Sequence, residues 1–333
     1  MKLLGTSKAF KNKAAQFLSG LALLCFAFPV AAGEIRIAVS KTPLSLPFFV
    51  AQEKKFFEKQ GVSPELIQCL GGVKCLQLML DGKSDLATCS ELPIVFNSFD
   101  RSDFALLASF VTNKNDMKFI ARGNSNFSKP DDFKKLKVGV VRRSASQYFF
   151  DVFMLFQGVD PADVDQVGMK PDELPSALAS GKVDAIAAWE PFGYLGLKAV
   201  TDAKEVAVPN LYTQTFNLVS KKSAINSNAA EITSIMKALQ MSINFINQNP
   251  EESKKILKDS VGLDAQFIEK AWSSYRFELA LRQSLVTTMV DQAKWAMRED
   301  HIRPDAKAPN LLNVIDARLI KKISPGTVNL LER

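Results

Sequence analysis

Two short stretches of the chain repeat each other: residues 81–88 read DGKSDLAT, and residues 180–187 read SGKVDAIA. Each follows a run with helical spacing and joins Gly-Lys-x-Asp to a short apolar segment typical of a strand. The glycine stands where helices commonly end in a left-handed residue. A match at the same place in a longer pattern indicates a repeated structural unit. We therefore predict two α/β units, with these turns as scaffold at the amino ends of strands.

The surrounding segments extend the repeat into a β-α-β-α-β pattern. In the first unit, strands and helices are expected to alternate over residues 35–39, 47–57, 65–69, 73–80 and 85–88. In the second unit, the corresponding segments are residues 138–141, 145–156, 164–167, 173–179 and 185–188. This alternation is typical of parallel sheets covered by helices. We expect an α/β fold of two Rossmann-like lobes with a ligand cleft between them.

The chain is expected to cross between the lobes twice. Residues 119–137 are polar and rich in turn residues, and residues 216–220 form an extended run after the second unit. Beyond residue 229 the chain has almost continuous helical periodicity, and this part is expected to complete the first lobe. The predicted domains are residues 34–120 with 217–333 for lobe 1, and residues 121–216 for lobe 2.

The first 33 residues have the pattern of a secretory signal peptide. Four lysines precede an apolar run over residues 17–30, and small residues allow cleavage after Ala32 or Gly33. An uncleaved membrane anchor is the alternative, although the apolar run is short for a span. Loss of the four lysines lowers the formal net charge from +7 to +3. That charge is too small to indicate nucleic acid or an anionic membrane as a partner. Cys25 lies within the apolar run but lacks the small residue that a lipoprotein signal has just before its cysteine, so we expect a soluble exported protein.

Three cysteines follow the predicted signal peptide: Cys69, Cys75 and Cys89. In an oxidising compartment, a disulfide between Cys69 and Cys75 would lock the glycine-rich turn between them. Two buried free thiols are the alternative. A metal site is disfavoured, because Cys-x5-Cys has no histidine or second cysteine pair nearby. Cys89 is expected to be a small core residue. We expect no metal and no cofactor.

Candidate site residues follow the predicted strands, because ligands of open parallel sheets bind beyond the carboxyl ends of the strands. In lobe 1 these positions are held by Ser40, Thr42, Gly71, Gly72, Ser90 and Glu91. In lobe 2 they are held by Arg143, Ser144, Ala145, Ser146, Trp189 and Glu190.

Two of these groups suggest specific chemistry. Ser144 precedes a helix whose unpaired N–H groups and positive dipole end can hold a sulfonate, phosphate or carboxylate, and Arg143 could add charge. Trp189 offers a flat apolar wall, and Glu190 can accept from an amine or an aminopyrimidine. The alternatives are an ordinary capping serine, a core tryptophan and a glutamate that caps the following helix.

The sequence contains none of the common catalytic or nucleotide-binding motifs: no Gly-x-Gly-x-x-Gly, Walker loop, His-Glu-x-x-His or Gly-x-Ser-x-Gly. Glu91 and Glu190 are carboxylates at strand ends, but neither has a His or Lys beside it in sequence. An enzyme would need a convergent acid, base or covalent residue in the cleft. We therefore expect a binding protein rather than an enzyme.

The ordered segments SKTPLSLPFFVAQEKKFFEKQGV, GGxxC, LMLDGKSDLAT, LKVGV and DAIAAWEPF resemble periplasmic solute-binding proteins of ABC importers. The resemblance is to the group that binds sulfonates, taurine, nitrate and thiamine pyrimidines, and it covers roughly residues 34–329. It implies the type II periplasmic binding fold, with a two-segment hinge and a ligand trapped by lobe closure. It also implies that ligand loops include Ser40, Thr42, Leu46, Gly71, Gly72, Ser90, Ser144, Ala145, Ser146, Trp189 and Glu190.

The resemblance further implies a monomeric periplasmic receptor that delivers a small organic solute to an inner-membrane permease and its ATPase. The first expected ligand is a sulfonate or a taurine-like zwitterion, with its anion near Ser144 and its apolar or amine part against Trp189 and Glu190. The second is a pyrimidine precursor of thiamine. An enzyme built on the same two lobes, or a receptor that serves a sensor protein, would also be consistent with this pattern.

Overall fold

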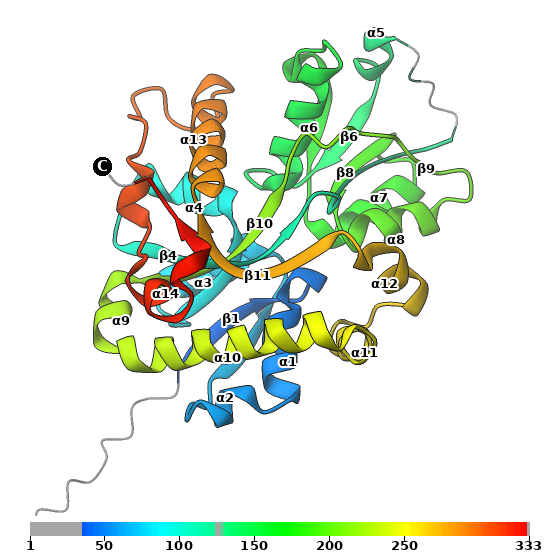
Figure 1. The fold of residues 1–333 in the computed structure, drawn as a ribbon. Helices are drawn as coiled ribbons and strands as arrows, with labels where there is room; N and C mark the ends of the chain where they lie inside the picture. The colour runs from blue at the N-terminus through cyan, green and yellow to red at the C-terminus, as the bar shows by residue number, and fades with distance from the viewer. Residues whose placement is uncertain (1–34, 124–126, 128, 332–333) are drawn as a thin grey trace, which may run out of the picture. The chain divides into compact units, whose positions relative to one another are not determined.

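The structure is a computed structural model that describes residues 35–123, 127 and 129–331. The predicted signal peptide and its cleavage site lie outside the described residues. Two β-sheets with helices packed on them make up the described chain (Figure 1). The predicted α/β fold with two sheets is confirmed.

The first sheet has the strand order β12-β11-β4-β10-β3-β1-β2. β1 pairs in parallel with β2 and β3, whereas β10 returns from late in the sequence and pairs antiparallel with β3 and β4. The strand bounds are β1 (Arg36–Ser40), β2 (Glu65–Cys69), β3 (Leu86–Ser90), β4 (Phe104–Asn113), β10 (Gln214–Lys221), β11 (Tyr275–Arg282) and β12 (Val328–Asn329).

The second sheet has the order β7-β6-β8-β5-β9. β6 pairs in parallel with β7 and β8, and β5 pairs antiparallel with β8 and β9. The strand bounds are β5 (Met117–Ala121), β6 (Lys137–Val140), β7 (Asp165–Gly168), β8 (Ala185–Trp189) and β9 (Lys204–Glu205). Both sheets therefore contain the parallel three-strand unit that the sequence repeat predicts.

Late helices pack against the first sheet and its early helices: α10 contacts α1 and β11, and α13 contacts α4. The helix bounds are α1 (Leu46–Glu53), α2 (Phe56–Lys59), α3 (Gly72–Leu80), α4 (Glu91–Ser98), α5 (Pro130–Phe133), α6 (Ala145–Phe156), α7 (Leu174–Ala179), α8 (Phe192–Ala199), α9 (Lys222–Ser227), α10 (Ala229–Gln248), α11 (Pro250–Val261), α12 (Ala265–Trp272), α13 (Gln283–Arg298) and α14 (Arg318–Ile323).

The two Gly-Lys-x-Asp turns have the same structural role in the two sheets. A carboxylate oxygen of Asp85 accepts from the backbone N–H of Arg36 at 2.8 Å, and one of Asp184 accepts from the N–H of Lys137 at 2.9 Å. Each aspartate thus ties the start of its own strand to the start of the neighbouring parallel strand. The turns are scaffold at the amino ends of the strands, as the sequence predicts.

The chain passes between the sheets at points that differ from the sequence expectation. It leaves β4 at Asn113 and enters the second sheet at Met117, and it returns between Glu205 and Gln214. The predicted domain boundaries, 120/121 and 216/217, fall inside β5 and β10. The polar run that resembled a linker is a connection between two strands of the second sheet, and the extended run near Phe216 is a strand of the first.

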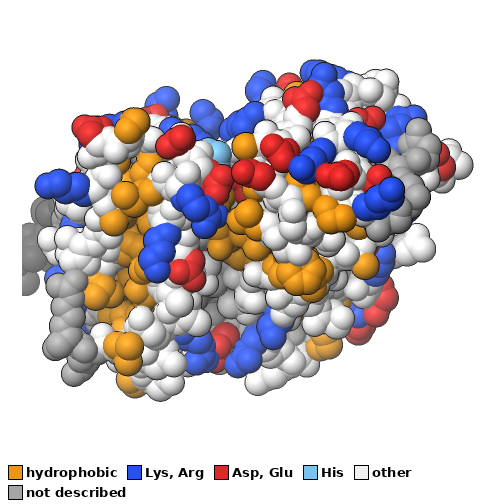
Figure 2. All heavy atoms as spheres, turned by 90° about the horizontal axis from the view of Figure 1, so that it is seen from above, with side chains coloured by type: hydrophobic (Ala, Val, Ile, Leu, Met, Phe, Trp, Pro, Cys, Tyr) orange, Lys and Arg blue, Asp and Glu red, His pale blue; other side chains and the backbone are white. Residues whose placement is uncertain are grey.

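The surface carries both signs of charge. Figure 2 shows Lys and Arg side chains interspersed with Asp and Glu on the face that it presents, without one extended patch of a single sign. None of the helices within the described residues is both long and apolar enough to cross a membrane.

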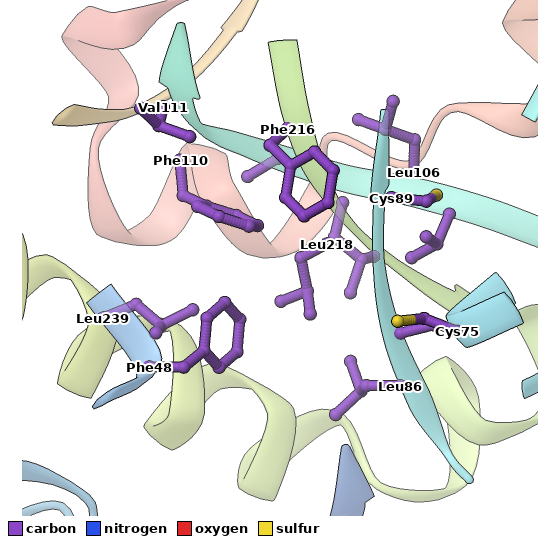
Figure 3. Close-up of a cluster of buried hydrophobic side chains, with 14 of the residues drawn as sticks. Phe48, Cys75, Leu86, Cys89, Leu106, Phe110, Val111, Phe216, Leu218 and Leu239 are labelled. Carbon is purple, nitrogen blue, oxygen red and sulfur yellow. The ribbon is translucent and has the colours of Figure 1, made fainter. Parts of the chain in front are cut away.

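A tightly packed apolar core joins the first sheet to α1 and α10. Phe110 of β4 lies between Phe48 of α1 and Phe216 of β10, with ring centres 5.1 Å and 5.9 Å away (Figure 3). Cys89 is fully buried in the same cluster as a free thiol, so its predicted core position is confirmed. This core unites segments from the beginning and the end of the described chain.

Cys69 and Cys75 form a disulfide, with Cα atoms 5.5 Å apart. The bridge joins the end of β2 to the first turn of α3 and encloses the Gly71-Gly72 turn. This observation selects the disulfide over a pair of free thiols and over a metal site.

Cys69→Ser with Cys75→Ser is expected to lower the free energy of unfolding by about 2 kcal/mol. A disulfide that closes so short a loop restricts the unfolded chain by roughly that amount. Urea unfolding of the double variant and of the oxidised wild type measures the difference. An equal midpoint for the two proteins would show that the bridge does not contribute to stability.

Candidate ligand site

A cavity lies where the carboxyl ends of the parallel strands in the first sheet face α6 and β8 of the second. Its lining residues are Ser40, Thr42, Leu44, Gly71, Gly72, Val73, Ser90, Ser144, Ala145, Trp189, Gln214 and Phe216. The cavity volume is only about 20 Å³, which is room for about one water molecule. The two sheets therefore close tightly around this point.

Three side chains in the lining have buried polar atoms without a partner among the described residues. They are the hydroxyls of Ser40 and Thr42 and the amide oxygen of Gln214. Their exposed fractions are 0%, 3% and 4%. An unpaired buried polar group costs about 1–3 kcal/mol, so these three atoms make the cavity a candidate site for a polar ligand.

The N-terminus of α6 reaches the cavity from the second sheet. Ser144 is the N-cap, and its Oγ accepts from the N–H of Ser146 at 3.2 Å and donates to the carbonyl of Val141 at 2.8 Å. Ser146 lies outside the lining, because its Oγ donates to Ala187 O at 2.6 Å and accepts from Val141 N. Ser144 is thus both a capping serine and a cavity residue, whereas Ser146 fixes the turn to β8.

Trp189 forms the apolar wall of the cavity. It ends β8, is 8% exposed, and contacts Phe192 edge-on. A side chain at Gly71 would place its Cβ 3.4 Å from the indole, and one at Gly72 would lie 2.7 Å from Cys89 Cα. The two glycines therefore allow the turn to approach the tryptophan and β3 closely. Trp189 is both largely buried and accessible from the cavity.

Five of the sequence-predicted site residues do not reach this cavity: Leu46, Glu91, Arg143, Ser146 and Glu190. Leu46 is fully buried in the first core cluster, at the start of α1. The geometry of the three charged residues shows where their side chains act instead.

Glu91 points into the protein. Its carboxylate accepts from the hydroxyl of Tyr212, from the N–H and hydroxyl of Thr215 at 3.2 and 2.8 Å, and from Gln292 Nε2 at 3.1 Å. Burial raises the pKa of Glu91, and the hydrogen bonds from Tyr212 and Thr215 oppose the rise. Glu91 therefore anchors the returning segment before β10 to α4 and α13.

Arg143 packs on the first-sheet half of the molecule. Its backbone is left-handed, with φ 54°, and its N–H donates to Gln147 Oε1 at 2.8 Å. Its guanidinium lies 4.7 Å from the centre of the Phe96 ring, a cation–π contact. The expectation that Arg143 adds charge beside the α6 N-terminus does not fit this geometry.

Glu190 lines a separate cavity with Lys118, Glu205, Lys270 and Tyr275, among others. Its Oε2 accepts from the N–H of Tyr194 at 2.9 Å, so it caps the following helix, which is the alternative role that the sequence allowed. Burial raises the pKa of Glu190 to about 7. Trp189 and Glu190 are adjacent in sequence but therefore line two different cavities.

Leu44, Val73, Gln214 and Phe216 line the cavity but were not among the sequence candidates. Gln214 and Phe216 are two residues apart on β10, so they project from the same face of the strand. Phe216 pairs with Ser90 in the sheet. The sequence did not indicate Gln214 and Phe216 as site residues, because β10 runs antiparallel. It therefore presents its first residues, rather than its last, at the carboxyl ends of the parallel strands.

None of the residues lining this cavity carries an ionisable side chain. Hydroxyls, an amide, backbone N–H groups and the helix N-terminus can bind an anion through neutral donors. The lining offers no acid-base pair and no activated nucleophile. Within the described residues, no group of three or more His, Cys, Asp or Glu side chains is placed to hold a metal ion.

Comparison with known proteins assigns the chain to a family. Residues 42–253 match the family described as "NMT1/THI5 like", and the chain belongs to this family. A Bacillus subtilis (strain 168) protein named for aliphatic sulfonate binding is 23% identical over 298 residues, covering 87% of each chain.

Solved structures share the fold. The alkanesulfonate-binding protein SsuA from Xanthomonas axonopodis pv. citri, bound to MOPS, has a TM-score of 0.72 and 16% identity, over 85% of this chain and 98% of that one. The desulfurization enzyme DszB has a TM-score of 0.64 and 12% identity, over 87% of this chain and 98% of that one. The fold is that of periplasmic binding proteins, and it also occurs in an enzyme.

Proposed function

We propose that this protein is the exported solute-binding component of an ABC importer and that it captures an aliphatic sulfonate. The observation that carries the proposal is the set of unpartnered buried polar atoms on Ser40, Thr42 and Gln214, opposite the N-terminus of α6. The two hydroxyls are neutral donors, and together with the α6 dipole they suit the oxygens of a sulfonate anion, whereas Gln214 Oε1 can only accept. The relative named for aliphatic sulfonate binding supports the same ligand class.

Ligand entry in this proposal requires the two sheets to separate, because the cavity holds only about one water molecule. The two connections between the sheets, residues 114–116 and 206–213, are the candidate hinge. Ligand binding favours the closed arrangement. A monomeric closed receptor then docks on an inner-membrane permease with its ATPase, from the periplasm, and the signal peptide directs export.

The lining of this cavity matches an alkanesulfonate better in charge than it matches taurine or a thiamine pyrimidine. Taurine carries an ammonium group, and a pyrimidine precursor offers amine donors, so both favour a carboxylate partner. The sequence offered Glu190 for that role, but its carboxylate lies at Tyr194 in the separate cavity. The lining of the sulfonate cavity contains no acid.

Thr42→Val is expected to weaken alkanesulfonate binding about tenfold while it raises protein stability by about 1 kcal/mol. The substitution removes a hydroxyl that is buried and unpaired without ligand, and that donates to the ligand when it is bound. Calorimetric titration with ethanesulfonate measures the affinity, and urea unfolding of the ligand-free protein measures the stability.

Ser45→Ala is the matched control for Thr42→Val. Ser45 also has a fully buried, unpartnered hydroxyl three residues along the chain, but it does not line the cavity. This variant should share the stability gain and keep the affinity. Equal affinity in the Thr42 and Ser45 variants would remove the proposed site.

Binding without turnover separates a receptor from an enzyme of the same fold. The cavity lining lacks a catalytic group, so the proposal expects ligand to be recovered unchanged after incubation, as measured by mass spectrometry. Appearance of sulfite or another product would favour an enzyme. Taurine, nitrate and an aminopyrimidine belong in the same panel, and preferential binding of any of them would overturn the alkanesulfonate choice.

A further inference from the structure

A second, wider cavity adjoins the candidate ligand site. The two cavities share Gly71, Val73 and Trp189 in their linings. The outer cavity has a volume of about 420 Å³, against about 20 Å³ for the inner one. A ligand that leaves the inner cavity past Trp189 therefore enters a much larger space.

The floor and sides of the outer cavity are apolar. Leu70 and Val73 are 44% and 45% exposed, which is unusual for large aliphatic side chains in this protein. Met169 and Pro171, after β7, line the opposite side. An apolar segment placed here would remove these side chains from water, at about 25 cal/mol per Å² of apolar surface buried. The indole of Trp189 continues this surface from the inner cavity.

Three cationic side chains complete the lining: Lys74, Arg142 and Lys170. The lining contains no acidic residue to offset them. Arg142 is held in place, since its Nη2 donates to Gln166 O at 2.6 Å and its stem packs on Gly168. Near Lys170, the Glu173 carboxylate binds the backbone N–H of that residue at 3.0 Å. The outer cavity thus combines an apolar surface with positive charge from both halves of the protein.

We propose that the outer cavity binds the far end of the same ligand and that this end carries a second anionic group. The ligand class is then a bifunctional acid: a sulfonate head in the inner cavity, an apolar or aromatic spacer along Trp189 and Val73, and a distal carboxylate or sulfonate near Lys74, Arg142 and Lys170. This inference rests on the proposed function. The neutral inner site selects the head, and the cationic outer site selects the tail.

The test compares ligands of equal length that differ only at the far end. Calorimetric titration at low ionic strength is made with hexane-1-sulfonate and with 6-sulfohexanoate. The carboxylate-terminated ligand is expected to bind about tenfold more tightly. This advantage should shrink with added salt, because Lys74, Arg142 and Lys170 are exposed. Equal affinity of the two ligands would overturn the inference.

Lys74→Gln with Lys170→Gln should reduce the advantage of 6-sulfohexanoate from about tenfold to about twofold, because only Arg142 of the three cations remains, and leave the affinity for hexane-1-sulfonate unchanged. The matched control is Lys83→Gln with Lys182→Gln, which removes two charges from the exposed turns at the amino ends of the strands and should preserve the advantage. An undiminished tenfold advantage in the Lys74/Lys170 variant would also overturn the inference. If simple alkanesulfonates bind without any preference for a distal acid, only this inference fails; if no sulfonate binds, the proposed function fails with it.

Discussion

Glu91→Ala is expected to lower the free energy of unfolding by about 4 kcal/mol. The substitution leaves the hydroxyl of Tyr212, both donors of Thr215 and the amide of Gln292 without their shared acceptor. Each orphaned buried donor costs about 1–3 kcal/mol, and the removed side chain leaves a cavity as well. Urea unfolding followed by tryptophan fluorescence and by circular dichroism measures the loss.

Glu91→Gln separates the hydrogen bonds from the volume of the side chain. Glutamine fills the same space and keeps one acceptor oxygen, so it should cost only about 1–2 kcal/mol. Neither variant removes a residue of the ligand cavity. If Glu91→Ala kept full stability and lost sulfonate binding, the carboxylate would be a ligand contact, as the sequence first suggested.

Eight of the predicted site residues converge on one cavity, and their role in ligand binding stays a prediction. These residues lie at or just after the carboxyl ends of parallel strands: Ser40, Thr42, Gly71, Gly72, Ser90, Ser144, Ala145 and Trp189. The carboxyl ends of parallel strands meet at one edge of each sheet. The repeat then places the two edges opposite each other. At these positions the local sequence pattern predicts the strand ends, and the sheet topology brings those ends together. The sequence alone could therefore predict that these residues lie close to one another.

The position of a residue after a parallel strand does not determine which of two neighbouring side chains faces the cavity. Ser90 lines it and Glu91 does not, because Glu91 meets Tyr212, Thr215 and Gln292, which are more than a hundred residues away in sequence. No local pattern reveals partners at that distance. The same limit applies to Arg143, whose orientation depends on Phe96.

The predicted domain boundaries, 120/121 and 216/217, differ from the points where the chain passes between the sheets for a related reason. Polar turn residues indicate where a helix or strand ends, but they do not indicate whether the next strand joins the same sheet. β5 and β10 both pair antiparallel with strands of the repeated units, and an antiparallel partner can come from any part of the chain. Their sheet membership required the three-dimensional pairing.

The stability of the protein is expected to fall by about 3 kcal/mol between pH 4.5 and pH 7 through Glu190 alone. Burial raises the pKa of Glu190 from 4.5 to about 7. In that interval the folded protein keeps a proton that the unfolded chain releases, so the free energy of unfolding decreases as pH rises. A difference of about 2.5 pKa units corresponds to about 3 kcal/mol.

The charged groups around Glu190 set the size of this effect. Lys118 and Lys270 lower its pKa, Glu205 raises it, and the N–H of Tyr194 favours the charged form, but none of these outweighs burial. Asp116 is also buried, and its pKa is raised by that burial and by Glu190. Because both acids keep protons in the folded state, Asp116 adds a dependence of the same sign.

Glu190→Gln isolates the contribution of Glu190. Glutamine mimics the protonated carboxyl and can still accept from Tyr194, so the variant should match the wild type at pH 4 and exceed its stability by about 3 kcal/mol at pH 8. Urea unfolding at both pH values measures the two differences. Asp116 remains in the variant, so a smaller decline with pH should persist. If the variant lost stability equally at pH 4 and pH 8, Glu190 would contribute by its shape and hydrogen bond to Tyr194 rather than by the proton that burial retains.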